Sequence, residues 1–169
     1  MTGISIRRGD GHRGNYQRKP FKVILDNMRS ARNVGAIMRT SDAAGAGELI
    51  LCGTTAIPPH KKIEQTAMGA EKYLQWRYEI HTLPAVKILK QQGLPIVVME
   101  TTTRSKNIWE VNYPRNLVLV CGNEALGIGE GVLELADYIV EIPMFGYKNS
   151  LNVASAFSVV VYEMIRQWQ

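Results

Sequence analysis

The sequence predicts an α/β fold: a mostly parallel sheet with helices on both of its faces. Two observations support this prediction. Short runs rich in Val, Ile and Leu, typical of buried strands, alternate along the chain with stretches of helical length. The 169 residues are also enough for one domain with a sizeable core.

The apolar runs and the capping residues give the expected elements in order. Strands are expected at residues 21–27, 48–52, 76–80, 96–100, 117–121 and 138–142. Helices are expected at residues 33–44, 61–65, 83–92, 132–136 and 150–169. Asn33 is the expected cap of the first helix, and Gly45 and Gly93 follow two helices at the position where glycine often terminates one.

Composition argues against several classes of protein. Cys52 and Cys121 lie at the ends of expected strands, so we interpret them as small buried side chains and leave catalytic cysteine as the alternative. The three histidines lie far apart without zinc-ligand spacing, so no metal site is expected. No run approaches the ~20 apolar residues of a membrane span, and the amino terminus has no apolar signal core. We therefore expect a cytoplasmic protein with no membrane association.

The net charge of +5 is concentrated at the amino terminus. Residues 1–20 contain five basic side chains and one aspartate, which together carry +4. Four glycines and almost no apolar periodicity accompany them. We expect a flexible basic extension over residues 1–20, followed by one domain over residues 21–169. The extension is either a solvated tail with no role or a segment whose positive charge attracts a polyanion such as RNA.

Three separated segments place polar residues where an expected strand meets an expected helix. They are residues 33–40, 117–124 and 150–156. Ligands of open α/β sheets bind at the carboxyl ends of strands, so the three segments are expected to form one site. The glycine-rich loop at residues 122–129 is neither a G-x-G-x-x-G dinucleotide fingerprint nor a Walker A motif.

In order and spacing, these segments closely resemble the three motifs of the SpoU (TrmH-like) RNA 2′-O-ribose methyltransferases, a branch of the SPOUT superfamily. The resemblance covers about residues 23–166. It implies an α/β-knot fold, with a deep trefoil knot in the carboxyl-terminal part. It also implies S-adenosylmethionine (SAM) as cofactor, tRNA or rRNA as substrate, and a homodimer.

The resemblance assigns roles to individual residues. The implied catalytic residues are Asn33, Arg39, Glu124, Ser150 and Asn152. The implied cofactor-binding residues are Cys121, Gly122, Asn123, Glu124, Ile142, Pro143, Met144, Ser150, Leu151 and Asn152. A guanidinium is too weak an acid to serve as general base, so we interpret Arg39 as a cation that stabilises the developing alkoxide. The simpler alternative for Arg39 is an ion pair with Asp42.

Two further segments bear on RNA and on assembly. Residues 67–73 resemble a substrate-side segment of the same family, with Lys61, Lys62 and Arg77 nearby. The last helix is apolar nearly all round, which predicts burial on more than one side and favours a dimer interface that includes Val160 and Met164.

The sequence thus favours a SAM-dependent RNA 2′-O-methyltransferase. A catalytically idle RNA-binding module of the same fold and a nucleotide-dependent α/β oxidoreductase remain the alternatives.

Overall fold

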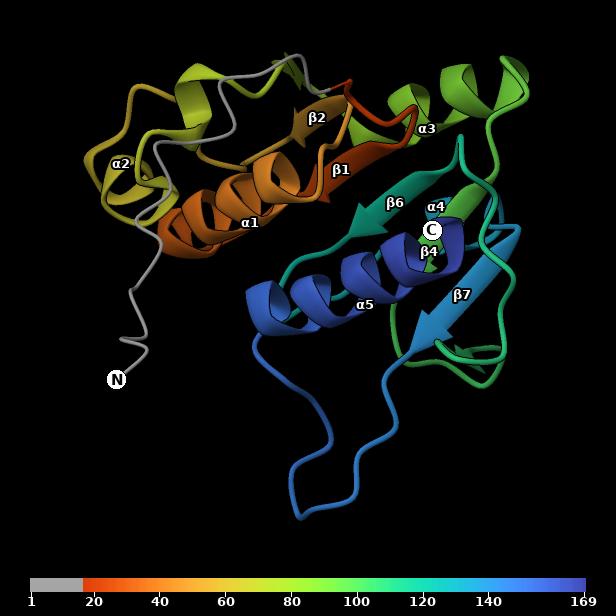
Figure 1. Cartoon of the computed structure of the whole chain (residues 1–169). Coiled ribbons are helices and arrows are strands. Elements are labelled where there is room, and N and C mark those ends of the chain that lie inside the picture. Colours follow the sequence, from red (N-terminus) through yellow and green to blue (C-terminus); the bar gives the residue numbers. More distant parts are fainter. Residues whose placement is uncertain (1–16) are drawn as a thin grey trace, which may run out of the picture.

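The computed structural model describes residues 17–169 (Figure 1). Most of the expected basic extension, residues 1–16, therefore lies outside the described residues. Arg18 belongs to the described part, where its Nη2 donates to Asp42 Oδ1 (2.7 Å) and to the carbonyl oxygen of Tyr73 (3.0 Å). Asp42 thus pairs with Arg18 rather than with Arg39, which excludes the simpler interpretation of Arg39.

Within this part of the chain, seven parallel strands form one sheet in the order β3-β2-β1-β6-β4-β7-β5. The strands are β1 (Lys22–Asp26), β2 (Glu48–Cys52), β3 (Trp76–Glu79), β4 (Ile96–Met99), β5 (Lys106–Asn107), β6 (Val118–Cys121) and β7 (Tyr138–Glu141). The helices are α1 (Ala31–Ala43), α2 (Lys61–Ala67), the 3-10 helix η1 (Ala70–Lys72), α3 (Thr82–Gln91), α4 (Glu130–Leu133) and α5 (Val153–Trp168). The predicted parallel sheet is confirmed. The two-residue strand β5 and the helix η1 were not predicted.

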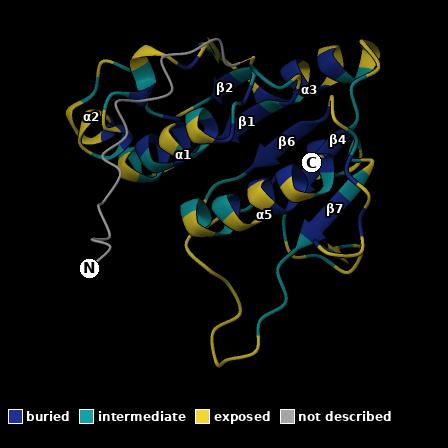
Figure 2. Ribbon diagram, viewed as in Figure 1, coloured by how far each residue is buried: buried dark blue, intermediate teal, exposed yellow. Residues whose placement is uncertain are grey.

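Each face of the sheet carries its own apolar core. Alternate side chains of a strand point to opposite faces. Val23 and Leu25 of β1 pack in one core with α1, α2 and α5, whereas Ile24 packs in the other with α3 and α4. Both cores consist almost entirely of buried residues (Figure 2). The prediction of helices on both faces is confirmed. The carboxyl-terminal knot stays a prediction.

Helix α1 begins at Ala31, two residues before the expected cap. Ser30, in an extended conformation, is the cap: its hydroxyl accepts from the backbone nitrogen of Asn33. The prediction that Asn33 caps the helix is therefore wrong, because Ser30 occupies that position and Asn33 lies in the first turn. As a result, the amide of Asn33 is available for contacts outside the helix. Gly45, with φ +74°, follows the helix end as predicted.

Helix α2 packs closely against α1 at Gly35. A Cβ at this glycine would lie 2.1 Å from Thr66 Oγ1 and 2.5 Å from the Ile63 carbonyl oxygen of α2. Thr66 Oγ1 in turn donates to the carbonyl oxygen of Arg32, at 2.9 Å. The absence of a side chain at position 35 therefore sets the separation of the two helices.

Helix α5 begins three residues later than predicted, because Asn152 caps it. Asn152 Oδ1 accepts from the backbone nitrogens of Ala154 (3.0 Å) and Ser155 (3.4 Å). Val160 and Met164 are fully buried in the core against the sheet. The prediction that they face a second subunit is therefore wrong. Val159 and Tyr162 of α5 are exposed instead. Figure 2 shows exposed positions recurring along the outer side of this helix.

The loop between β7 and α5 extends away from the body of the protein, at the bottom of Figure 1. Phe145 and Tyr147 in this loop are almost fully exposed. Within residues 17–169, no helix is both long and apolar enough to cross a membrane.

Candidate active site

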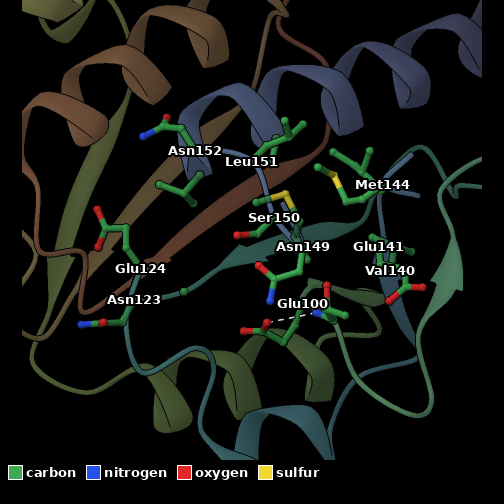
Figure 3. Close-up of a pocket in the computed structure, with 16 residues that line it drawn as sticks. Glu100, Asn123, Glu124, Val140, Glu141, Met144, Asn149, Ser150, Leu151 and Asn152 are labelled. Carbon is green, nitrogen blue, oxygen red and sulfur yellow. Dashed lines mark hydrogen bonds between the residues drawn. The ribbon is translucent and has the colours of Figure 1, made fainter. Parts of the chain in front are cut away.

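A cavity of about 230 Å³ lies at the carboxyl ends of β4, β6 and β7 (Figure 3). We call it the strand-end cavity. Its lining residues are Met99, Glu100, Thr101, Gly122, Asn123, Glu124, Val140, Glu141, Ile142, Met144, Asn149, Ser150, Leu151, Asn152, Val153 and Ala156. They come from the loops after three neighbouring strands and from the start of α5. The cavity therefore forms where parallel strands present their carboxyl ends, as the sequence predicted.

The structure brings most of the predicted cofactor-binding residues to this cavity. The two exceptions are Cys121 and Pro143. Cys121 is fully buried in the core, and Pro143 lines an adjoining hollow together with Lys148.

Sequence reasoning missed Glu100 and Thr101. The available signal was a polar residue at the end of an apolar strand, the same signal that pointed to residues 122–124.

Glu124 connects the loop after β6 to the turn before α1. Its carboxylate accepts hydrogen bonds from the backbone nitrogens of Arg29 (2.9 Å) and Ser30 (3.3 Å) and from Asn33 Nδ2 (2.8 Å). Asn152 Nδ2 donates to Asn33 Oδ1 at 3.2 Å and extends the chain of hydrogen bonds to α5. Three of the predicted catalytic residues, one from each motif, therefore contact one another in series.

These hydrogen bonds set the charge of Glu124. Partial burial on its own raises the pKa of this carboxyl. The donors on Arg29, Asn33 and Ser30 act in the opposite direction, and the net effect is a pKa below the usual value for glutamate. Glu124 is therefore an ionised acceptor at neutral pH and a poor base.

The loop after β6 is held by polar contacts at both of its ends. Asn123 Nδ2 donates to the carbonyl oxygen of Asn27, while Asn123 Oδ1 accepts from the backbone nitrogens of Ala125 and Leu126. At the other end, Glu100 Oε2 accepts from the backbone nitrogen of Ile128 at 3.1 Å. Gly127 has φ +67°, and a Cβ there would lie 2.6 Å from Glu100 Oε2, so this position requires glycine.

A second hollow, of about 660 Å³, lies on the other side of Glu124 and Asn152. We call it the basic hollow. Its lining residues are Arg29, Ser30, Ala31, Arg32, Asn33, Ala56, His60, Lys62, Glu124 and Asn152. The strand-end cavity and the basic hollow therefore share a wall, and that wall consists of predicted catalytic side chains.

Arg39 and Ser150 lie apart from this hydrogen-bonded chain. Ser150 lines the strand-end cavity. Arg39 is exposed on α1 and lines neither the cavity nor the basic hollow. The described structure thus brings together four of the five predicted catalytic residues and leaves Arg39 outside the group.

The two cysteines are explained by burial. Both cysteines are free and buried, as predicted. Burial is the main reason that the pKa of Cys52 rises to about 11, and burial also raises the pKa of Cys121. Such thiols are poor nucleophiles. Over residues 17–169, no group of His, Cys, Asp and Glu side chains is arranged to hold a metal ion.

Comparison with known families gives this arrangement its context. Residues 20–162 match the model of the SpoU rRNA Methylase family. The chain belongs to the SpoU family. One relative is the tRNA (guanosine(18)-2′-O)-methyltransferase of Thermus thermophilus, which is 32% identical over 152 residues; these cover 89% of this chain and 77% of the relative.

Solved structures of SpoU enzymes share the fold. The Aquifex aeolicus TrmH/SpoU tRNA modifying enzyme superposes with a TM-score of 0.81 at 32% identity, over 89% of this chain and 76% of that one. An AdoMet-bound rRNA methyltransferase from Sinorhizobium meliloti gives 0.83 at 28% identity, over 90% of this chain and 58% of that one. SAM is therefore the cofactor of the family, and its characterised members act on tRNA or rRNA.

The strand-end cavity fits the chemistry of SAM. Met99, Val140 and Leu151 offer apolar surface for an adenine ring, and carboxylates offer partners for cationic groups. Gly122 lets the buried Ile128 side chain pack directly against the loop that lines the cavity, because a Cβ there would lie 2.6 Å from Ile128. The residues present are consistent with the SpoU cofactor.

The double role of Asn152 generates a prediction. Asn152→Ala removes the cap of α5, so we expect a loss of about 1 kcal/mol in the free energy of unfolding, or a melting temperature lower by roughly 2–4 °C. Asn152→Ser retains a capping oxygen and should melt close to the wild type, although it also lacks the amide that donates to Asn33. Calorimetric melting of the three proteins tests this, and equal melting of the alanine variant and the wild type would contradict the capping role.

Proposed function

We propose that this protein is a SAM-dependent RNA 2′-O-ribose methyltransferase that acts on tRNA or rRNA. The observation that supports this proposal best is the wall of Glu124 and Asn152 that two hollows of different chemistry share. Asn33 is hydrogen-bonded to both residues of this wall. The strand-end cavity suits a cationic cofactor, and the basic hollow suits the phosphates of a nucleotide. A group transferred from one to the other passes this wall.

In this proposal, each hydrogen-bonded residue positions a reactant. When bound, SAM supplies an electrophilic methyl group to the ribose 2′-oxygen. Ser150, Leu151 and the loop that begins at Gly122 hold the cofactor side. Glu124 and Asn152 orient the ribose, since both line the cavity and the basic hollow. The low pKa of Glu124 suits it to accept hydrogen bonds from the substrate rather than to remove the proton.

Arg39 has a separate role in the proposal. Its guanidinium is exposed on α1, outside the group formed by the other catalytic residues. We assign it to a site completed across a subunit boundary, where it binds a substrate phosphate and stabilises the developing alkoxide. This assignment requires a homodimer. A deep trefoil knot in the carboxyl-terminal part of the chain, a cytoplasmic location and a contribution of residues 1–20 to RNA affinity also belong to the proposal.

Cofactor binding is the primary test of this function. Isothermal titration calorimetry on the full chain, without added metal, should show binding of both SAM and its demethylated product S-adenosylhomocysteine (SAH). Binding of neither compound to folded protein would overturn the assignment. RNA binding without SAM binding would instead favour an idle module.

Substitution of Arg39 tests its role in the chemistry. Arg39→Ala should lower the rate of methyl transfer to RNA roughly 10²–10³-fold, the usual effect of losing one preorganised donor. Its affinity for SAM should stay near that of the wild type, because Arg39 does not line the strand-end cavity. Arg39→Lys, which keeps the charge but not the planar fork, should be intermediate. Full activity of the alanine variant would show that Arg39 has no part in the reaction.

The basic hollow predicts a salt-dependent interaction with RNA. Arg32→Ala and Lys62→Ala should each weaken binding of unfractionated tRNA and reduce the slope of log affinity against log salt by about 1, because each removes a cation that neutralises one phosphate. Lys87→Ala is the matched control, because Lys87 is also exposed on a helix but lies on α3, at the other face of the sheet. Identical salt slopes in all variants would rule out the hollow as an RNA-binding surface.

The exposed face of α5 predicts the assembly. Val159 and Tyr162 leave apolar and aromatic surface uncovered on a helix whose other side is in the core. Sedimentation equilibrium at micromolar concentration should give twice the 18.9 kDa of one chain. Tyr162→Glu should reduce that mass to one chain without loss of the folded circular dichroism spectrum. A monomeric wild type would exclude the dimer.

A further inference from the structure

All the charged side chains that line the strand-end cavity are acidic. Glu100, Glu124 and Glu141 contribute three carboxylates, and no Lys, Arg or His is among the described residues that line it. The three acids come from the ends of three different strands and lie around one space (Figure 3). The basic side chains line the two adjoining hollows instead: Arg29, Arg32, Lys62 and Lys148.

The three carboxylates are fixed in position by donors. Glu124 accepts three hydrogen bonds from the turn before α1 and from its first turn. Glu100 accepts from the backbone nitrogens of Thr101 (3.0 Å) and Ile128 (3.1 Å). Glu141 Oε2 accepts from the Ser105 hydroxyl at 2.6 Å. Hydrogen-bond donors therefore hold all three carboxylates in position, including that of Glu124, which is exposed.

The proposed reaction changes the charge of the molecule in this cavity. The bond between the methyl carbon and the sulfonium breaks, and its electron pair stays on sulfur. The methyl carbon bonds to the ribose 2′-oxygen, whose proton passes to solvent. SAM carries a sulfonium, an ammonium and a carboxylate, so its net charge is +1 at neutral pH. SAH carries a neutral thioether in place of the sulfonium, so its net charge is zero.

We propose that Glu100, Glu124 and Glu141 make the cavity select its ligand by charge, so that SAM binds more tightly than SAH and methyl transfer itself weakens the hold on the product. This inference rests on the proposed function. Fixed carboxylates with low-dielectric walls attract a cation more strongly than they attract a neutral ligand of the same shape. Release of the spent cofactor is then promoted by loss of the charge that held it.

The test compares three ligands by calorimetry: SAM, SAH and sinefungin. Sinefungin has a carbon bearing a protonated amine in place of the sulfonium, so it shares the net charge of SAM without its reactive methyl group. In the wild type, the dissociation constant of SAH should exceed those of SAM and sinefungin. In Glu100→Gln and in Glu141→Gln, the ratio of the SAH constant to the SAM constant should fall roughly threefold to tenfold. The double variant should bring it close to one.

The ratio of the SAH to the SAM dissociation constant distinguishes a loss of charge from a loss of structure. Glu100→Gln places an amide against one of two backbone donors, so it can weaken the loop, but a weakened loop reduces binding of all three ligands alike. Glu141→Gln retains an oxygen for the Ser105 hydroxyl and provides a second, milder variant. Glu134→Gln is the matched control, since Glu134 is exposed and does not line the cavity. It should leave the ratio unchanged.

A salt titration of the wild type gives a readout that needs no variant. Added salt screens charge, so it should weaken binding of SAM and sinefungin and leave SAH nearly unaffected. A ratio that is the same in the wild type and both glutamine variants overturns the inference, as does equal salt dependence of the three ligands. Failure of all three ligands to bind the wild type would instead overturn the proposed function.

Discussion

The carboxylate of Glu124 is the contact on which the arrangement of this site depends. It joins the loop after β6 to the turn that starts α1, two segments that are more than ninety residues apart. Both segments follow central strands of the sheet, because β1 and β6 pair directly. Parallel pairing alone brings the strand ends to one edge. Hydrogen bonds to a single ionised side chain then fix how the loops beyond that edge meet.

This contact also gives the site its two sides. The loops after β4, β6 and β7 and the start of α5 form the strand-end cavity, and the turn before α1 forms part of the basic hollow. Glu124 and Asn152 line both. Under the proposed function, a residue between the two hollows would contact both reactants, so the lowered pKa of Glu124 would keep its charge constant during the reaction. Protonation of Glu124 would remove its negative charge and weaken the hydrogen bonds that hold the turn before α1.

The sequence predicted the parallel sheet well, because its strands are continuous apolar runs, as burial on both faces requires. It did not predict β5, since two residues, one of them Lys106, carry no hydrophobic pattern. The sequence also did not predict the strand order, because the pairing of β1 with β6 joins segments that are far apart along the chain. Ser30 and Asn33 are equally good caps by residue type, so sequence alone could not choose between them. In the structure Ser30 caps the helix and the amide of Asn33 contacts Glu124. The same applies to Asp42, which prefers the distant Arg18 to Arg39.

The tight contact at Gly35 means that the shape of the basic hollow can change without a change in the strand-end cavity. Helix α2 carries Lys62, and His60 caps it through Nδ1, yet neither contributes to the strand-end cavity. A methyl group at position 35 would collide with Thr66 and with the backbone of α2, and would push that helix outward from α1. The loops around Gly122 and Asn152 would stay in place. One added carbon at position 35 would thus change the shape of the basic hollow, which Lys62 and His60 line, without touching a residue that lines the strand-end cavity.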